Sequence, residues 1–152
     1  MVKKVILKGT YCLIIHVNRD ITLRVGKKLG SIIFDEGYYV YVGSALNSLE
    51  SRLKRHLSDD KKLFWHVDYL LSSSDAELVE IVFAVDGSRW ECVLASMIGM
   101  EGVEIRGFGC SDCKCISHLF KFDDLDRSIG VCVNSFKKLL LEPKKLDDLG
   151  NL

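Results

Sequence analysis

The sequence predicts an α+β domain in which antiparallel strands pack against helices. Three observations point to this class. The first 43 residues contain β-rich runs separated by turn residues, the segment after Gly43 changes to a helical spacing of leucines, and 48% of the 152 residues are apolar. A chain of this length and apolar content buries its own core. We therefore expect one domain over residues 1–142 and a loose polar tail over 143–152.

The first part of the chain has the pattern of an antiparallel meander. Residues 10–17 and 21–25 are rich in β-branched and aromatic residues, and so are 31–34 and 38–42. Short segments of Asn, Asp and Gly separate these runs, as in hairpins. The turns are expected at 18–20, 26–30 and 35–37.

The spacing of apolar residues changes after Gly43. Leu49, Leu53 and Leu57 recur every fourth residue, which predicts an amphipathic helix, with Asn47 or Ser48 as its N-cap. Similar patterns predict a helix over 63–71, a strand over 77–85 and a helix over 89–98 that Ser88 can cap. An irregular segment is expected over 99–118, followed by a strand over 119–122. The last element is a helix that ends near Leu141, before Pro143.

The charge balance limits the partners that this chain can bind. It has 21 Lys and Arg against 21 Asp and Glu, so a strongly basic surface is excluded. Contact with nucleic acid therefore needs a local basic patch. The densest group of basic residues is Arg52, Lys54, Arg55, Lys61 and Lys62.

The sequence also predicts where the protein resides. No apolar run approaches the roughly 20 residues that a membrane helix requires. The apolar start is interrupted by Lys8, too early for a secretory signal. We expect a cytoplasmic protein that does not contact membranes.

One constellation of residues could carry chemistry. It contains Tyr11 and Tyr41 in strands, Arg52 and His56 on one helix face, and Glu91 beside apolar neighbours. Each residue also has a purely structural interpretation: tyrosines pack in strands, and an acid is favoured at a helix start. A carboxylate among apolar side chains is nevertheless costly unless it is paired, protonated or bound to a cation.

Short motifs along the chain carry a family resemblance. Gly9-Thr10-Tyr11 followed by Tyr41-Val42-Gly43, with Arg52 in the next helix and Glu91 in a later one, resembles the GIY-YIG nuclease superfamily. The tracts Tyr41–Leu57, Phe64–Leu70 and Gly107–Phe120 resemble its DUF123 branch, a small and mostly archaeal family that also occurs fused to endonuclease III-type repair enzymes. The resemblance covers about residues 9–122.

The resemblance implies a fold and a role for each matching residue. The fold would be a central three-stranded antiparallel sheet flanked by helices, with an inserted hairpin and a C-terminal helix. Tyr11 and Tyr41 would orient or deprotonate the attacking water, and Arg52 would hold the scissile phosphate. Glu91 would bind Mg²⁺ or Mn²⁺, and His56 would accept a proton.

These residue types fit hydrolysis of a phosphodiester bond. Negative charge gathers on the phosphoryl oxygens in the transition state, and arginine with a divalent cation offsets it. A single carboxylate suits Mg²⁺, which keeps most of its waters. Together with this chemistry, the resemblance implies a metal-dependent endonuclease acting on DNA, in repair and alongside a repair-protein partner. The alternative is a catalytically silent module that binds nucleic acid or a partner protein through the basic patch.

The chain departs from the family pattern at three places. Thr10 replaces the isoleucine of the first motif, and Ser44 stands where several nucleases carry a lysine. The separation of Tyr11 from Tyr41 is also longer than usual, which requires an inserted hairpin.

A second constellation combines thiols with an imidazole. Cys110, Cys113, Cys115 and His118 fall within one short loop and could close a tetrahedral zinc site. This would make the chain a zinc-stabilised interaction domain. Two other interpretations stay open: the loop lines the nuclease cleft, or it is a tight polar loop with small thiols. His66 is a candidate for a supporting role near the cleft.

Overall fold

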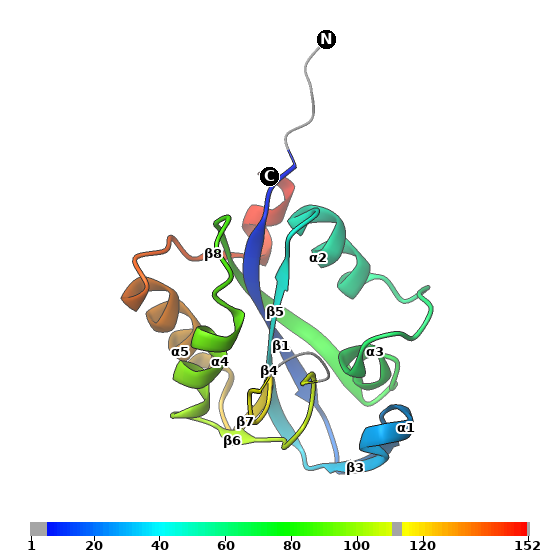
Figure 1. The fold of residues 1–152 in the computed structure, drawn as a ribbon. Coiled ribbons are helices and arrows are strands. Elements are labelled where there is room, and N and C mark those ends of the chain that lie inside the picture. Colours follow the sequence, from blue (N-terminus) through cyan, green and yellow to red (C-terminus); the bar gives the residue numbers. More distant parts are fainter. Residues whose placement is uncertain (1–5, 111–113, 152) are drawn as a thin grey trace.

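The computed structural model describes residues 6–110 and 114–151 (Figure 1). Its centre is a six-stranded antiparallel sheet with helices on both faces. The expected α+β class is confirmed, and the sheet has more strands than the three that were expected. Its strands lie in the order β6 (Val103–Glu104), β7 (Leu119–Phe122), β4 (Gly37–Ala45), β1 (Gly9–Val17), β5 (Ala76–Val85) and β8 (Lys144–Lys145).

Strand β1 lies in the middle of the sheet and is buried along its length. It pairs with β4 on one side and β5 on the other, and Tyr11 lies opposite Gly43. Successive side chains of a strand point to opposite faces, so Tyr11 and Leu13 face one core while Cys12 and Ile14 face the other. An apolar run such as this one is typical of a strand covered on both faces.

The first face of the sheet is covered by α2 (Leu49–Leu57) and α3 (His66–Leu71). The inserted hairpin packs there too. It consists of β2 (Ile21–Arg24) and β3 (Ser31–Phe34), and Phe34 is fully buried. The predicted leucine face of α2 is confirmed at Leu49 and Leu53, which join this core, whereas Leu57 at the end of the helix is exposed. Ser48 is the N-cap, and its hydroxyl accepts a hydrogen bond from the Ser51 N–H.

The second face is covered by α4 (Glu91–Gly99) and α5 (Leu125–Lys138), on the other side of the ribbon in Figure 1. Helix α4 begins at Glu91, after Trp90, and has no side-chain cap. The predicted cap at Ser88 is therefore wrong, because the helix begins later than its apolar stripe suggested.

Two segments expected to be irregular contain short regular elements. The turn at 26–30 includes the four-residue helix α1 (Gly26–Leu29). The segment 99–118 includes β6, which pairs with β7 and forms one edge of the sheet. Elements this short leave no periodic signal in a sequence.

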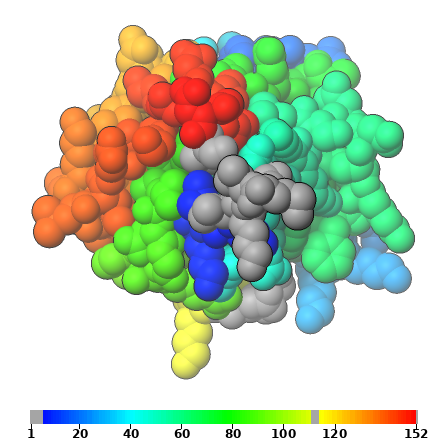
Figure 2. Space-filling view, turned by 90° about the horizontal axis from the view of Figure 1, so that it is seen from above, coloured from blue at the N-terminus to red at the C-terminus, as the bar shows by residue number. Residues whose placement is uncertain are grey.

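The prediction of a loose tail over 143–152 is wrong for the residues that the structure describes. Strand β8 pairs with Val82 and Phe83 of β5, and a 3₁₀ helix, η1 (Leu146–Asn151), follows it. Leu149 is buried in the first core, and the Leu146 N–H donates to the Glu80 carboxylate at 3.0 Å. Figure 2 shows this segment in red, packed against the body of the domain. Among the described residues, no helix is long and apolar enough to cross a membrane.

Candidate active site

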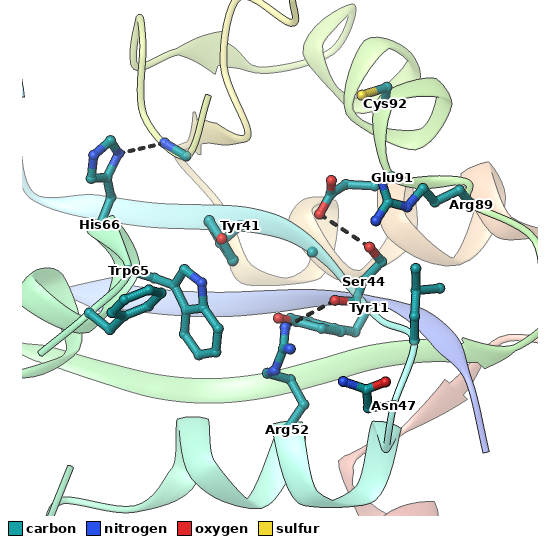
Figure 3. Close-up of a pocket in the computed structure, with 14 residues that line it drawn as sticks. Tyr11, Tyr41, Ser44, Asn47, Arg52, Trp65, His66, Arg89, Glu91 and Cys92 are labelled. Atoms are coloured by element: carbon teal, nitrogen blue, oxygen red, sulfur yellow. Dashed lines mark hydrogen bonds between the residues drawn. The ribbon is translucent and has the colours of Figure 1, made fainter. Parts of the chain in front are cut away.

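A cavity of about 750 Å³ lies where α2, α3 and the start of α4 meet the central strands β1 and β4 (Figure 3). Four of the residues expected at the site line it, and each comes from a different element. Tyr11 lies on β1, Tyr41 on β4, Arg52 on α2 and Glu91 on α4. The cavity therefore unites side chains that are spread over eighty positions of the sequence.

The two tyrosines of this cavity are almost completely buried. Tyr11 is 2% exposed and Tyr41 is 8% exposed. Burial raises the pKa of Tyr11 to about 12, although the nearby Arg52 works in the opposite direction. Burial likewise raises the pKa of Tyr41 well above its usual value, and the neighbouring Tyr11 adds to this. Both phenols thus keep their hydrogen at neutral pH.

His56 lies behind Tyr11 and does not line the cavity. Its Nε2 shares a 2.8 Å hydrogen bond with the Tyr11 Oη, and its ring packs against Trp65. Burial lowers the pKa of His56 to about 3, so the ring is neutral. A ring with this pKa is a weak proton acceptor at neutral pH. Its position suits it to orient the Tyr11 hydroxyl.

Arg52 is fixed at the cavity wall by two contacts. Its Nη1 donates to the Ser44 carbonyl oxygen at 3.0 Å. Its guanidinium carbon lies 4.4 Å from the centre of the Trp65 ring, within the range of a cation–π interaction. These contacts hold a positive charge in the cavity beside Tyr11.

Glu91 lies at a helix start and at the cavity wall. It is the first residue of α4, where an acid is favoured, and it also lines the cavity. The Ser44 hydroxyl donates to the Glu91 Oε1 at 3.4 Å (Figure 3). Ser44 thus contacts the carboxylate that the sequence resemblance assigns to a metal ion.

Most of the predicted basic patch is occupied by contacts within the protein. Arg55 makes a bidentate ion pair with the fully buried Asp68, with both N–O distances 2.9 Å. Lys61 donates to the carbonyl oxygens of Arg55 and His56 at the end of α2. Lys54 pairs with Glu50 at 2.7 Å. Lys62 is exposed, and its carbonyl oxygen accepts from Arg55.

Asp68 stabilises the start of α3 through hydrogen bonds. Its carboxylate accepts hydrogen bonds from the N–H groups of Phe64 and Trp65 as well as from Arg55. Burial raises the pKa of Asp68, but these hydrogen bonds outweigh it and leave the pKa below its usual value. Through these bonds, Asp68 holds Trp65 where it contacts Arg52.

His66 supports the cavity from its opposite end. Its Nδ1 accepts a 2.8 Å hydrogen bond from the Gly109 N–H, and both residues line the cavity. Gly109 has a φ of 75°, which favours glycine. This bond connects α3 to the loop before β7.

The thiol and imidazole groups come together in a set that differs from the expected one. Ligand atoms of Cys92, Cys115 and His118 all lie within 4.8 Å of one another. Cys110 lies apart from this group, with its Sγ 3.5 Å from the Phe108 carbonyl oxygen, and Cys113 lies outside the described residues. Sequence analysis missed Cys92, whose only signal is its place directly after Glu91.

A comparison with protein-family models matches residues 10–141 to the family described as a domain of unknown function, DUF123. No curated protein and no solved structure matches the chain.

Proposed function

The chain belongs to the DUF123 family of domains, and from the geometry of its cavity we propose that it is a metal-dependent endonuclease that hydrolyses phosphodiester bonds in DNA. The observation that supports this proposal is the convergence of Tyr11, Tyr41, Arg52 and Glu91 on one cavity. These are the four residues that the resemblance to GIY-YIG nucleases matched in order.

Arg52 supplies the positive charge that this reaction needs. Its guanidinium is held between the Ser44 carbonyl and the Trp65 ring, so it needs little reorganisation to meet a phosphate. Fixed positive charge near the phosphoryl oxygens lowers the barrier, because negative charge grows there in the transition state.

Glu91 and Ser44 offer a carboxylate and a hydroxyl oxygen on the cavity wall. Oxygen donors suit Mg²⁺ or Mn²⁺, and one carboxylate is enough for an ion that keeps most of its waters. These two residues would hold the cation, which would add positive charge beside the phosphate.

The tyrosines would orient the attacking water. Their raised pKa values keep the phenols neutral, so each can donate one hydrogen bond and accept another. His56 would fix the rotation of the Tyr11 hydroxyl from behind. The buried tyrosines are therefore better suited to orient the attacking water than to deprotonate it, because deprotonation would require a phenolate.

The alternative is a silent module that binds nucleic acid through the basic patch. It has weaker support, because Lys54, Arg55 and Lys61 each have a partner within the protein. A binding surface would have to give up these contacts or rely on Lys62 and Arg52.

Cleavage of supercoiled plasmid and of branched DNA with Mg²⁺ or Mn²⁺ tests the proposal. We expect nicking by the native chain, at least a hundredfold slower for Glu91→Ala and Tyr41→Phe. Glu77→Ala removes an exposed carboxylate from β5 and should cleave like the native chain. Nicking that every variant retains would identify a contaminant. Bound but uncut DNA would favour the silent module.

A further inference from the structure

We propose that Cys92, Cys115 and His118 form a Zn²⁺ site that ties the start of α4 to the segment before β7. The proposal rests on these three residues alone and holds whether or not the neighbouring cavity cleaves DNA.

The three ligand atoms are already close to a metal-binding arrangement. They lie within 4.8 Å of one another. In a tetrahedral zinc site with Zn–S near 2.3 Å and Zn–N near 2.0 Å, ligand atoms are about 3.5 to 3.8 Å apart. Side-chain rotations of an exposed Cys92 and a half-buried Cys115 can close this difference.

The ligands come from two separate parts of the chain. Cys92 is on the first turn of α4, while Cys115 and His118 precede and adjoin β7. Zinc sites usually join two segments in this way, which relieves the strain of a cage built from one short loop. The arrangement therefore favours zinc more than the loop-only set of Cys110, Cys113, Cys115 and His118 expected from the sequence.

The imidazole ring of His118 is held by the backbone of β4. It is 2% exposed, and its Nδ1 lies 3.1 Å from the Val42 carbonyl oxygen. A carbonyl can only accept, so Nδ1 carries the hydrogen and Nε2 has the lone pair. A backbone carbonyl that fixes the other ring nitrogen is the usual support for a histidine bound to zinc. The Val42 N–H also donates to the His118 carbonyl at 2.9 Å, which anchors the residue to β4.

The chemistry of this set selects the metal. Two thiolates and one imidazole favour Zn²⁺ over Mg²⁺, which prefers oxygen ligands. Binding releases the two thiol protons to solvent. Among the described residues, the site offers three protein ligands, and one of them, Cys92, is exposed.

Cys92 lies between two cavities of the protein. Cys92 lines the 750 Å³ cavity and also a second cavity of about 550 Å³ that Cys115 lines. Figure 3 shows Cys92 next to Glu91 at the start of α4. Zinc bound here would fix the helix turn that carries Glu91.

Metal content and cobalt spectra of the reduced full chain test this proposal. We expect one zinc per chain after purification, and a cobalt-substituted form with thiolate-to-metal charge-transfer absorption. Cys92→Ser and Cys115→Ser should each weaken zinc binding at least tenfold in a chelator competition and reduce the absorption. Cys132→Ala, which removes a thiol buried in the second core, should bind zinc like the native chain. Glu91→Ala should also keep its zinc, which separates this site from the proposed catalytic one.

Three results would overturn the proposal. One is the absence of tight binding when the reduced chain is titrated with zinc. Another is undiminished affinity in Cys92→Ser with loss in Cys110→Ser, which would place the metal in the loop alone. The third is a Cys92–Cys115 disulfide in the protein as isolated from cells, found by mass spectrometry without reduction.

Discussion

Gly43 faces Tyr11 across the β1–β4 pair so closely that a Cβ atom at Gly43 would lie 2.6 Å from the Tyr11 Oη. Real Cβ contacts are not this short, so either the ring or strand β4 would have to move. The glycine leaves the space in which the phenol reaches both His56 and the cavity.

Gly43→Ala should therefore displace the Tyr11 ring. We expect a loss of stability of about 1–3 kcal/mol, as in overpacked cores, and at least a tenfold loss of any cleavage activity. Denaturant unfolding and the plasmid assay measure the two effects. Gly87→Ala is the matched control, because a Cβ there meets nothing within 4 Å. Equal behaviour of the two variants would show that Tyr11 tolerates displacement.

Loss of the buried Asp68 carboxylate should destabilise the protein strongly, because its partners would remain without an acceptor. Asp68→Ala would leave a guanidinium and the N–H groups of Phe64 and Trp65 without their acceptor, so we expect a loss of about 3–5 kcal/mol in unfolding free energy. Asp123 also forms an ion pair, with Lys121, but its side chain is 96% exposed. Asp123→Ala should change stability by only about 0.5 kcal/mol. Similar losses for both variants would contradict this assignment.

Acid should destabilise the protein well above the pH at which carboxylates titrate. The unfolded chain protonates His56 near pH 6.5, whereas the folded chain keeps it neutral down to about pH 3. Because the unfolded state binds more protons in this window, the unfolding free energy falls as pH falls. His66, whose pKa burial also lowers, acts in the same direction.

Denaturant unfolding between about pH 7 and pH 5 measures this dependence. The lower limit excludes most of the contribution of Asp68, because the unfolded chain begins to protonate this carboxyl only below about pH 5. His56→Gln keeps a hydrogen-bonding group beside Tyr11 and should remove the larger part of the slope. His66→Gln should remove less, because its ring is less buried. An unchanged slope in His56→Gln would show that His56 is not the source.

The residues around the cavity were accessible to sequence analysis because they belong to regular elements with local signals. Tyr11 and Tyr41 are on strands rich in β-branched and aromatic residues, and Arg52 is on a helix with leucines at every fourth position. His56 shares that helix face, but its burial could not be predicted. It depends on packing against Trp65, which directly precedes α3.

Cys92 and the C-terminal segment were missed for a different physical reason. The contact of Cys92 with Cys115 and His118 depends on how α4 packs beside β7, which no short spacing encodes. Similarly, Lys144 and Lys145 have no strand pattern of their own, and they pair only because β5 offers an edge.

The pairing of β8 with the edge of β5 also affects how one molecule meets another. The far side of β5 would otherwise present the backbone groups of Val82 and Phe83 to solvent, in the apolar half of the strand. Exposed edges of this kind pair with strands of other molecules and begin aggregation. Because Lys144 and Lys145 of β8 occupy this part of the β5 edge, a strand from another molecule cannot pair with it there.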